Sequence, residues 1–263
     1  MPRFAANLSM LYTEHEFLDR FAAAAKDGFE GVEYLGPYDF DVKDVKNALD
    51  SAGLSQVLFN FPSGDWAAGE RGIAALPGRE DEFRAGVDQA LRYAEALGCR
   101  QINCLSGKVP EGIHRDAALD VLSDNLSYAA PKLADAGMRL LVEPINHFDI
   151  PGFALNSSAD TLALFDRIGA ENLWLQYDFY HMQRMQGELI GTFKAHQNRI
   201  AHVQIADNPG RHEPGTGEIN YAFIFEQLDA LHYDGWVGCE YMPLGSTSAG
   251  LGWSKDILKG STA

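Results

Sequence analysis

The chain has 263 residues, of which 46% are hydrophobic and 11% aromatic, so it can bury a large core and is not disordered over most of its length. Its formal net charge is −16, from 21 basic and 37 acidic residues, which repels DNA, RNA and anionic membrane surfaces. We therefore expect neither a nucleic-acid partner nor a membrane partner.

The cysteines and the N-terminal segment indicate a reducing compartment. The three cysteines, Cys99, Cys104 and Cys239, form no CxxC pair and leave an odd thiol, so we expect buried free thiols rather than a disulfide framework or a zinc ribbon. Segment 1–17 lacks the apolar region of a signal peptide, and no run approaches the ~18 apolar residues of a membrane span. These features predict a cytoplasmic protein.

Short apolar runs alternate with segments of helical periodicity along the chain. The runs predict strands over 3–9, 31–35, 55–61, 101–107, 139–145, 173–180, 200–207 and 236–241. Segments 14–28 and 79–98 are examples of the amphipathic helices between them, and Gly98 is a typical helix stop. Such alternation predicts a parallel sheet with right-handed crossovers.

Eight such units at this length predict a closed (β/α)8 barrel, a TIM barrel, over 1–263 as a single domain. The alternative, an open sheet that binds a dinucleotide, needs a glycine-rich turn after the first strand. Segment 6–17 contains no glycine, so we expect no nucleotide cofactor. The longest irregular segment, 62–80, follows the third strand and is a candidate binding loop.

Four later strands of the predicted barrel each end in an oxygen-bearing side chain: Glu143, Asp178, Gln204 and Glu240. Any one of them alone is as well explained by a structural role beside a local partner. Active sites of such barrels lie at the carboxyl ends of the strands, however, and three carboxylates that converge there require a cation. Oxygen ligands favour Mg²⁺ or Mn²⁺ over Zn²⁺.

The same rim carries candidates for acid–base chemistry and substrate contact. Glu143 and Glu240, on opposite sides of the run of ligands, are the candidate acid and base. His181 and Arg211 are further polar groups on this rim, and in segment 62–80 the candidate substrate contacts are Trp66, Glu70 and Arg71. We interpret the glycine-rich segment 213–221 as a tight rim turn rather than a phosphate-binding loop. For His202 a role behind the ligands and a role in the core remain equally open.

This pattern resembles the xylose isomerase-like family of metal-dependent sugar isomerases and epimerases. The resemblance covers nearly the whole chain through "RFAANLSML", "GDWAAGERGIAALPGRE", "EPINHFDIPGF", "YDFYHMQRMQGEL", "HVQIADNPGRHEPGTGEINY" and "GWVGCEY". It implies an eight-stranded barrel whose metal is held by Glu143, Asp178, Gln204 and Glu240. It also implies acid–base roles for Glu143 and Glu240.

The chain departs from the ketose epimerases of that family at one strand, which reads "HVQ" where they carry "HxH". The departure puts Gln204 in place of a histidine ligand and makes the chain more similar to the hydroxypyruvate-isomerising branch. His181 and Arg211 match residues that contact substrate oxygens in the epimerases. Asp149 falls where they have another substrate-binding carboxylate, although its side chain is shorter.

The resemblance therefore implies reversible isomerisation of hydroxypyruvate to 2-hydroxy-3-oxopropanoate, with one glutamate removing a proton and a glutamate returning it. An anionic substrate, a 2-oxo or hydroxy acid, needs a cation, for which Arg71 and Arg211 are the first candidates and Lys108 the third. The alternatives are a 2-oxo-tetronate isomerase or ketose 3-epimerase, a metal-dependent phosphodiesterase or abasic-site endonuclease, and a binding module. The sequence does not decide whether the protein forms a homo-oligomer. Phe148, Phe153 and Trp253 are candidates for an interface, but for each of them we expect a role in the core.

Overall fold

The computed structural model describes residues 2–254, and within this range eight parallel strands close into a barrel in chain order. The strands are β1 (Arg3–Asn7), β2 (Gly31–Tyr34), β3 (Ser55–Asn60), β4 (Gln101–Cys104), β5 (Arg139–Val142), β6 (Leu173–Asp178), β7 (Ile200–Ile205) and β8 (Trp236–Cys239). The barrel closes where β1 pairs with β8. The predicted TIM barrel is confirmed.

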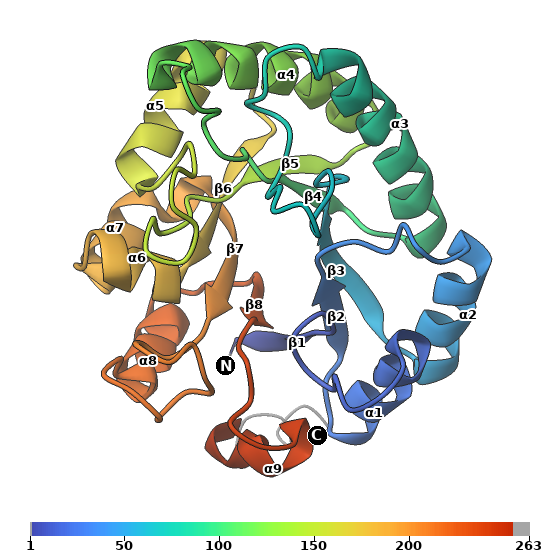
Figure 1. Cartoon of the computed structure of the whole chain (residues 1–263). Helices are drawn as coiled ribbons and strands as arrows, with labels where there is room; N and C mark the ends of the chain where they lie inside the picture. Colours follow the sequence, from blue (N-terminus) through green and yellow to red (C-terminus); the bar gives the residue numbers. More distant parts are fainter. Residues whose placement is uncertain (1, 255–263) are drawn as a thin grey trace.

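Helices surround the barrel, as the view along its axis shows (Figure 1). They are α1 (Arg20–Lys26), α2 (Val42–Ala52), α3 (Glu80–Leu97), α4 (Arg115–Asp135), α5 (Ser158–Ile168), α6 (Phe179–Met185), α7 (Leu189–His196), α8 (Tyr221–Ala230) and α9 (Thr247–Gly250), with short 3-10 turns η1 (Phe17–Asp19), η2 (Gln197–Arg199) and η3 (Leu251–Ser254). None of the helices within 2–254 has the length and hydropathy needed to cross a bilayer.

Each predicted strand begins at the residue where the structure starts it but ends earlier than predicted. At β5, for example, the last strand residue is Val142, and Glu143 and Pro144 already belong to the loop. Proline has no N–H to donate to a strand neighbour, so the ladder cannot continue through it. Of the polar residues expected at strand ends, Glu143 and Glu240 therefore lie just beyond β5 and β8, whereas Asp178 is the last residue of β6 and Gln204 lies within β7.

The inside of the barrel changes from apolar to polar along the strands. Toward the amino ends, Ala5, Leu141 and Ala201 pack with Trp174 and Trp236. Because side chains alternate along a strand, Asn7 follows Ala5 and Glu143 follows Leu141 on the same inner face. The barrel interior is therefore apolar toward the amino ends of the strands and polar toward their carboxyl ends. We call this polar layer, which lies beneath the candidate site, the polar floor.

Most of the cysteines and aromatic residues singled out in the sequence lie in the core. Cys99, Cys104 and Cys239 are all buried and free. Of the three aromatics considered for an interface, Phe148 is 59% exposed, Phe153 is buried, and Trp253 is partly buried against Phe4. Phe153 is thus part of the core and unavailable to a partner.

Candidate active site at the carboxyl ends of the strands

A cavity of about 450 Å³ opens at the carboxyl ends of the strands. Its floor and walls include Glu143, Glu240, His181, Arg211, Trp66 and Arg71. These residues come from the segments after β3, β5, β6, β7 and β8, so the barrel gathers at one point side chains that are far apart in the sequence. All six were predicted as site residues: His181, Arg211, Trp66 and Arg71 as substrate contacts, and Glu143 and Glu240 as both acid–base groups and metal ligands.

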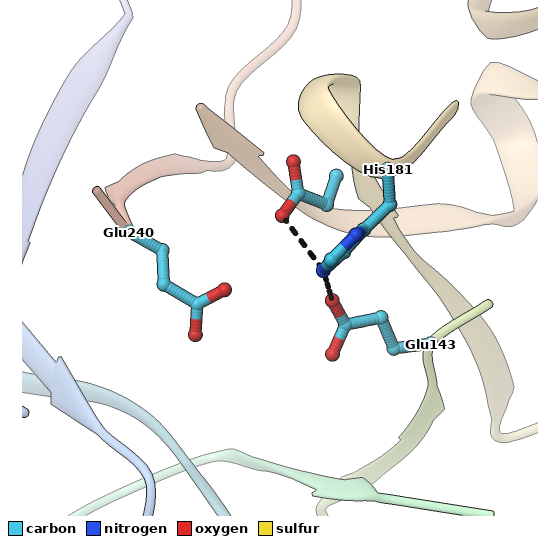
Figure 2. Close-up of side chains that lie close together, drawn as sticks. Glu143, His181 and Glu240 are labelled. Carbon is cyan, nitrogen blue, oxygen red and sulfur yellow. Dashed lines mark ion pairs between the residues drawn. The ribbon is translucent and has the colours of Figure 1, made fainter. Parts of the chain in front are cut away.

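Four buried groups converge at the base of this cavity: Glu143, Asp178, His181 and Glu240, each with one ligand atom within 4.8 Å of the others. Figure 2 shows Glu240 reaching toward the centre from the side opposite Glu143, with His181 beside Glu143. His181 Nε2 lies 3.7 Å from Glu143 Oε1 and 3.6 Å from Asp178 Oδ2. The structure thus brings together the three carboxylates predicted as metal ligands.

The donor set of this cluster fits a divalent cation. Within residues 2–254, Glu143 Oε1 and Asp178 Oδ2 are buried and have no hydrogen-bond partner. A buried carboxylate oxygen without a partner is costly, and a cation among these oxygens removes that cost. The cluster is therefore suited to hold a divalent metal ion.

Burial and mutual repulsion raise the carboxyl pKa values at the centre. Desolvation, followed by the charges of Glu240 and Asp178, raises the pKa of Glu143 well above its ordinary value. Desolvation likewise raises the pKa of Asp178 to about 6 and that of Glu240 to about 8. For His181, desolvation and then the charge of Arg211 lower the pKa well below its ordinary value. Carboxyl groups whose pKa values are raised toward neutrality in one cavity are typical of acid–base catalysis.

Arg211 is the cation in direct contact with this cluster. Its Nη2 donates a 2.8 Å hydrogen bond to Glu240 Oε2, and its side chain lies over the Tyr180 ring. The backbone of Arg211 has a φ of 56°, a left-handed conformation uncommon for a side-chain-bearing residue, in the turn after β7. The turn thus directs the guanidinium inward, where it partly neutralises the carboxylates.

Gln204, the fourth predicted metal ligand, lies in the polar floor below the cluster. Its Nε2 donates to Glu33 Oε1 at 2.7 Å, and its Oε1 accepts from Gln176 Nε2 at 2.7 Å. Gln176 Nε2 also donates to Glu143 Oε2 at 2.9 Å. The two hydrogen bonds fix which end of the Gln204 amide is oxygen, and its role as a metal ligand stays a prediction.

Glu33 on β2 is the centre of this floor and was missed in the sequence. It is 1% exposed and accepts hydrogen bonds from Asn7 and Gln204, while His202 Nε2 lies 2.6 Å from its Oε2. Asn7 Nδ2 also donates to Glu240 Oε1 at 3.1 Å, which links Glu33 to the catalytic candidate. A charged residue inside the short apolar run "GVEYL" was the signal that could have revealed it.

Two features explain how Glu33 and His202 are accommodated. A Cβ at Gly238 would lie 2.3 Å from Glu33 Oε2, so only glycine leaves room for this carboxylate at β8. His202 is fully buried. It contacts Glu33 in the polar floor and does not belong to the cluster of Glu143, Asp178, His181 and Glu240 above that floor. Of the two roles left open for His202, the structure favours the one behind the predicted ligands.

The segment after β3 contributes two of the predicted contacts to the cavity. The Arg71 guanidinium stacks 3.9 Å above the Trp66 ring, and its Nη1 donates to the Trp66 and Glu70 carbonyl oxygens. Glu70 turns away and accepts from Arg79 Nη1 at 2.8 Å, so it shapes the loop and does not line the cavity. Lys108 is not among the lining residues either.

The two remaining predictions concern Asp149 and the segment 213–221. Asp149 lines the cavity, but its carboxylate is paired with Arg184 and accepts from Tyr180 OH at 2.8 Å. In the glycine-rich segment, Gly215 N and Gly217 N both donate to Asp207 Oδ2. Because a carboxylate of the chain already occupies these donors, the segment is a rim turn, as expected, and not a phosphate-binding loop.

Comparison with known proteins decides the family. The model of the xylose isomerase-like TIM barrel family matches residues 21–257. The chain belongs to this family. The family resemblance noted in the sequence is thereby confirmed over nearly the whole chain.

Among members of the xylose isomerase-like family, the chain is 55% identical to a hydroxypyruvate isomerase of Escherichia coli (strain K12), over 96% of this chain and 98% of that protein. It is 50% identical to a 2-oxo-tetronate isomerase of Cupriavidus necator, over 98% and 99% of the two chains. A crystal structure described as an AP endonuclease, family 2, from Brucella melitensis superposes with a TM-score of 0.95 at 48% identity, covering 98% of this chain and 99% of that one. The two named enzymes place the chain among the isomerases of the family.

Proposed function

We propose that this protein interconverts hydroxypyruvate and 2-hydroxy-3-oxopropanoate. The observation that carries the proposal is the buried cluster in which Glu143 and Glu240 face one another across the base of the cavity. The 55% identity to a hydroxypyruvate isomerase along nearly the whole chain supports this choice of substrate. Position 204 is a glutamine where the ketose epimerases usually have a histidine, and this difference favours hydroxypyruvate over a ketose as the substrate.

In this reaction one C–H bond breaks and another forms. The hydroxymethyl group loses one proton from its carbon and one from its hydroxyl and becomes the aldehyde, while the carbonyl carbon and its oxygen each gain one proton and become the C–H and O–H of the new alcohol. A divalent ion, Mg²⁺ or Mn²⁺, held by Glu143, Asp178, Gln204 and Glu240 would polarise the two oxygens and acidify the C–H bond. No redox cofactor is needed, because the oxidation at one carbon balances the reduction at its neighbour.

The residues of the chain supply the proton transfers and the binding of the anion. Glu143 and Glu240 are the groups that take the proton from one carbon and return a proton to the next. Arg211 and His181 reach the oxygens that gain negative charge as the proton leaves. Arg71, stacked on Trp66, is the candidate partner for the substrate carboxylate because its Nε and Nη2 make no protein hydrogen bond within residues 2–254.

A second candidate substrate is 2-oxo-tetronate. The 50% identity to a 2-oxo-tetronate isomerase supports it, as does a cavity of about 450 Å³, which has room for a substrate of more than three carbons. Both substrates are anionic 2-oxo acids, so Arg71, Glu143 and Glu240 would act on each in the same way. An endonuclease function is disfavoured because the cluster brings one histidine rather than several to the strand ends, and because the net charge is −16.

The test is a substrate panel in D₂O with added Mg²⁺ or Mn²⁺, followed by proton NMR. We expect hydroxypyruvate to be converted and the product to carry solvent deuterium at the carbon that becomes C–H. Turnover of 2-oxo-tetronate at a higher kcat/KM would assign the second substrate instead. If neither acid exchanges its C–H proton while a ketohexose does, the proposal is wrong.

A further inference from the structure

We propose that Asn146, held in place by Asp149, is a positioning residue that keeps the His181 proton on Nε2. His181 then presents an N–H group to the centre and is not one of its metal ligands. Asn146 lies in the segment after β5 and is fully buried. It was not singled out in the sequence, where "EPINHFD" gives no periodicity that marks it.

Asp149 fixes the orientation of the Asn146 amide from two sides. The backbone N–H of Asp149, which can only donate, donates to Asn146 Oδ1 at 2.8 Å. The Asp149 carboxylate, which can only accept when ionised, accepts from Asn146 Nδ2 at 3.1 Å. The carboxylate is held in turn by Arg184 and by the Tyr180 hydroxyl. The amide nitrogen of Asn146 therefore points toward His181.

This orientation decides which nitrogen of His181 carries the proton. Asn146 Nδ2 lies 2.6 Å from His181 Nδ1, and because Nδ2 is a donor, Nδ1 must accept. A proton on Nδ1, in the other tautomer or in the imidazolium, would place two donors 2.6 Å apart. Rotating the Asn146 amide to avoid this would set its nitrogen against the Asp149 N–H and its oxygen against the Asp149 carboxylate. The short contact between Asn146 Nδ2 and His181 Nδ1, together with the two hydrogen bonds between Asn146 and Asp149, thus assigns a neutral His181 ring protonated on Nε2.

The Nε2–H group faces the carboxylates of the centre. Its neighbours are Asp178 Oδ2 at 3.6 Å and Glu143 Oε1 at 3.7 Å, the same oxygens that lack hydrogen-bond partners within residues 2–254. Arg211 Nη2, a donor, lies 3.4 Å from Nε2 and opposes this assignment. That contact is long and Arg211 Nη2 already donates to Glu240 at 2.8 Å, so it is weaker than the 2.6 Å contact at Nδ1.

The consequence for catalysis rests on the proposed function. A metal ligand must offer a lone pair, so a ring with its proton on Nε2 leaves the metal to the oxygen ligands. The N–H is instead free to donate to the substrate oxygen that gains negative charge. Asn146 would thereby determine both the ligand set and the polarity of the hydrogen bond to substrate.

The first test measures the tautomer without substrate or metal. In ¹⁵N-labelled protein kept metal-free with a chelator, long-range ¹H–¹⁵N correlation spectra distinguish the two neutral forms by the shifts of Nδ1 and Nε2. The His181→Gln variant identifies the relevant signals by their loss. We expect the pattern of an Nε2–H ring, and the pattern of Nδ1–H or of imidazolium at pH 7 would overturn the proposal. This result is independent of whether hydroxypyruvate is the substrate.

The second test exchanges the two side chains in the double variant Asn146→Asp/Asp149→Asn, which keeps charge and volume. The carboxylate now next to Nδ1 can only accept, so we expect His181 to change to Nδ1–H and kcat to fall about 10–100-fold, as when other residues that orient a site are changed. Because Nε2 then offers a lone pair, affinity for Zn²⁺ relative to Mg²⁺ should rise at least tenfold in titration calorimetry.

The matched control is Asp149→Asn alone, in which the residue-149 backbone N–H still holds Asn146 Oδ1. We expect its NMR spectrum to keep the Nε2–H pattern. If the double variant also keeps that pattern, Asn146 does not set the tautomer and the proposal fails. If the double variant does not fold, the wild-type spectrum and the single variant still decide the assignment of the proton.

Discussion

At the scale of single residues, burial governs the chemistry of the centre. Three carboxylates are buried there: Glu143, Asp178 and Glu240 are each at most 5% exposed. The cationic side chain that hydrogen-bonds to them is that of Arg211, which donates to Glu240. Three carboxylates beside one guanidinium leave an excess of negative charge in a poorly solvated place, which is unstable without a further cation or bound protons. A bound metal ion would replace these protons, so that the carboxylates are ionised and able to accept a proton from the substrate.

Replacing either glutamate by glutamine tests the acid–base pair. Glutamine keeps an oxygen for the metal but cannot accept and return a proton. We expect Glu143→Gln and Glu240→Gln each to lower kcat about 10²–10⁴-fold, with a smaller change in KM. Steady-state kinetics and the rate of deuterium exchange measure this. Glu226→Gln on the exposed face of α8 is the control, and near-wild-type turnover in either active-site variant would refute the assigned roles.

Glu33→Gln tests the polar floor. An amide at this position must turn its NH₂ either toward the donors Asn7 and Gln204 or toward His202, whose Nε2 would then have to accept, and in both arrangements the buried carboxylate charge is lost. We expect the free energy of unfolding to fall by about 1–3 kcal/mol and metal affinity to fall about 10–100-fold. Urea denaturation and titration calorimetry measure the two effects. The exposed Glu30→Gln, three residues earlier, should change neither.

At the scale of elements, the segment between β3 and α3 brings a cation over the cavity. Arg71→Met removes the guanidinium but keeps apolar contact with Trp66. A charge-assisted hydrogen bond contributes about 1.5–3 kcal/mol, so we expect KM for hydroxypyruvate to rise about 10–100-fold while exchange in an uncharged ketose is little affected. Arg100→Met, remote from the cavity lining, is the control. An equal loss for charged and uncharged substrates would mean that Arg71 shapes the loop only.

The strands of the barrel and the carboxylates at their ends were predictable from the sequence for one physical reason. Buried parallel strands read as apolar runs, and a carboxylate that ends such a run, such as Glu143, stands out against it. Strand ends were less predictable because the apolar pattern continues for a few residues after the ladder stops. Asn146 and Gln176 were not predictable, because their roles depend on contacts between different loops or strands that one segment does not encode.

At the scale of the whole molecule, the chain is strongly acidic, yet arginines line the cavity beside its carboxylates. The formal charge of the chain is −16, and the cavity is lined by three arginines, Arg71, Arg184 and Arg211, together with three carboxylates, Glu143, Asp149 and Glu240. Local cations bind an anion at short range, while the surrounding charge acts over a distance limited by salt to about 10 Å at 0.1 M. An acidic enzyme can therefore act on an acidic substrate, because the arginines meet the substrate where solvent screening is weakest.

The whole molecule also responds to pH and metal through the raised pKa values. In the metal-free protein the pKa of Glu240 is raised from 4.5 to about 8 and that of Asp178 from 3.8 to about 6. The folded state therefore binds more protons than the unfolded state between these limits, and its stability falls as the pH rises. We expect the Tm measured with a chelator to decrease from pH 5 to pH 8, and the decrease to be smaller in Glu240→Gln.

A bound metal reverses this dependence, because it replaces the protons that the carboxylates would otherwise need. At a metal concentration of 100 times Kd the folded state gains about 2.7 kcal/mol, and Kd itself decreases as the pH rises. The increase in Tm on adding Mg²⁺ or Mn²⁺ should therefore be small at pH 5 and large at pH 8. Scanning calorimetry at both pH values, with Glu226→Gln as control, measures it. A metal-induced increase that is the same at both pH values would show that the ion binds elsewhere than among these carboxylates.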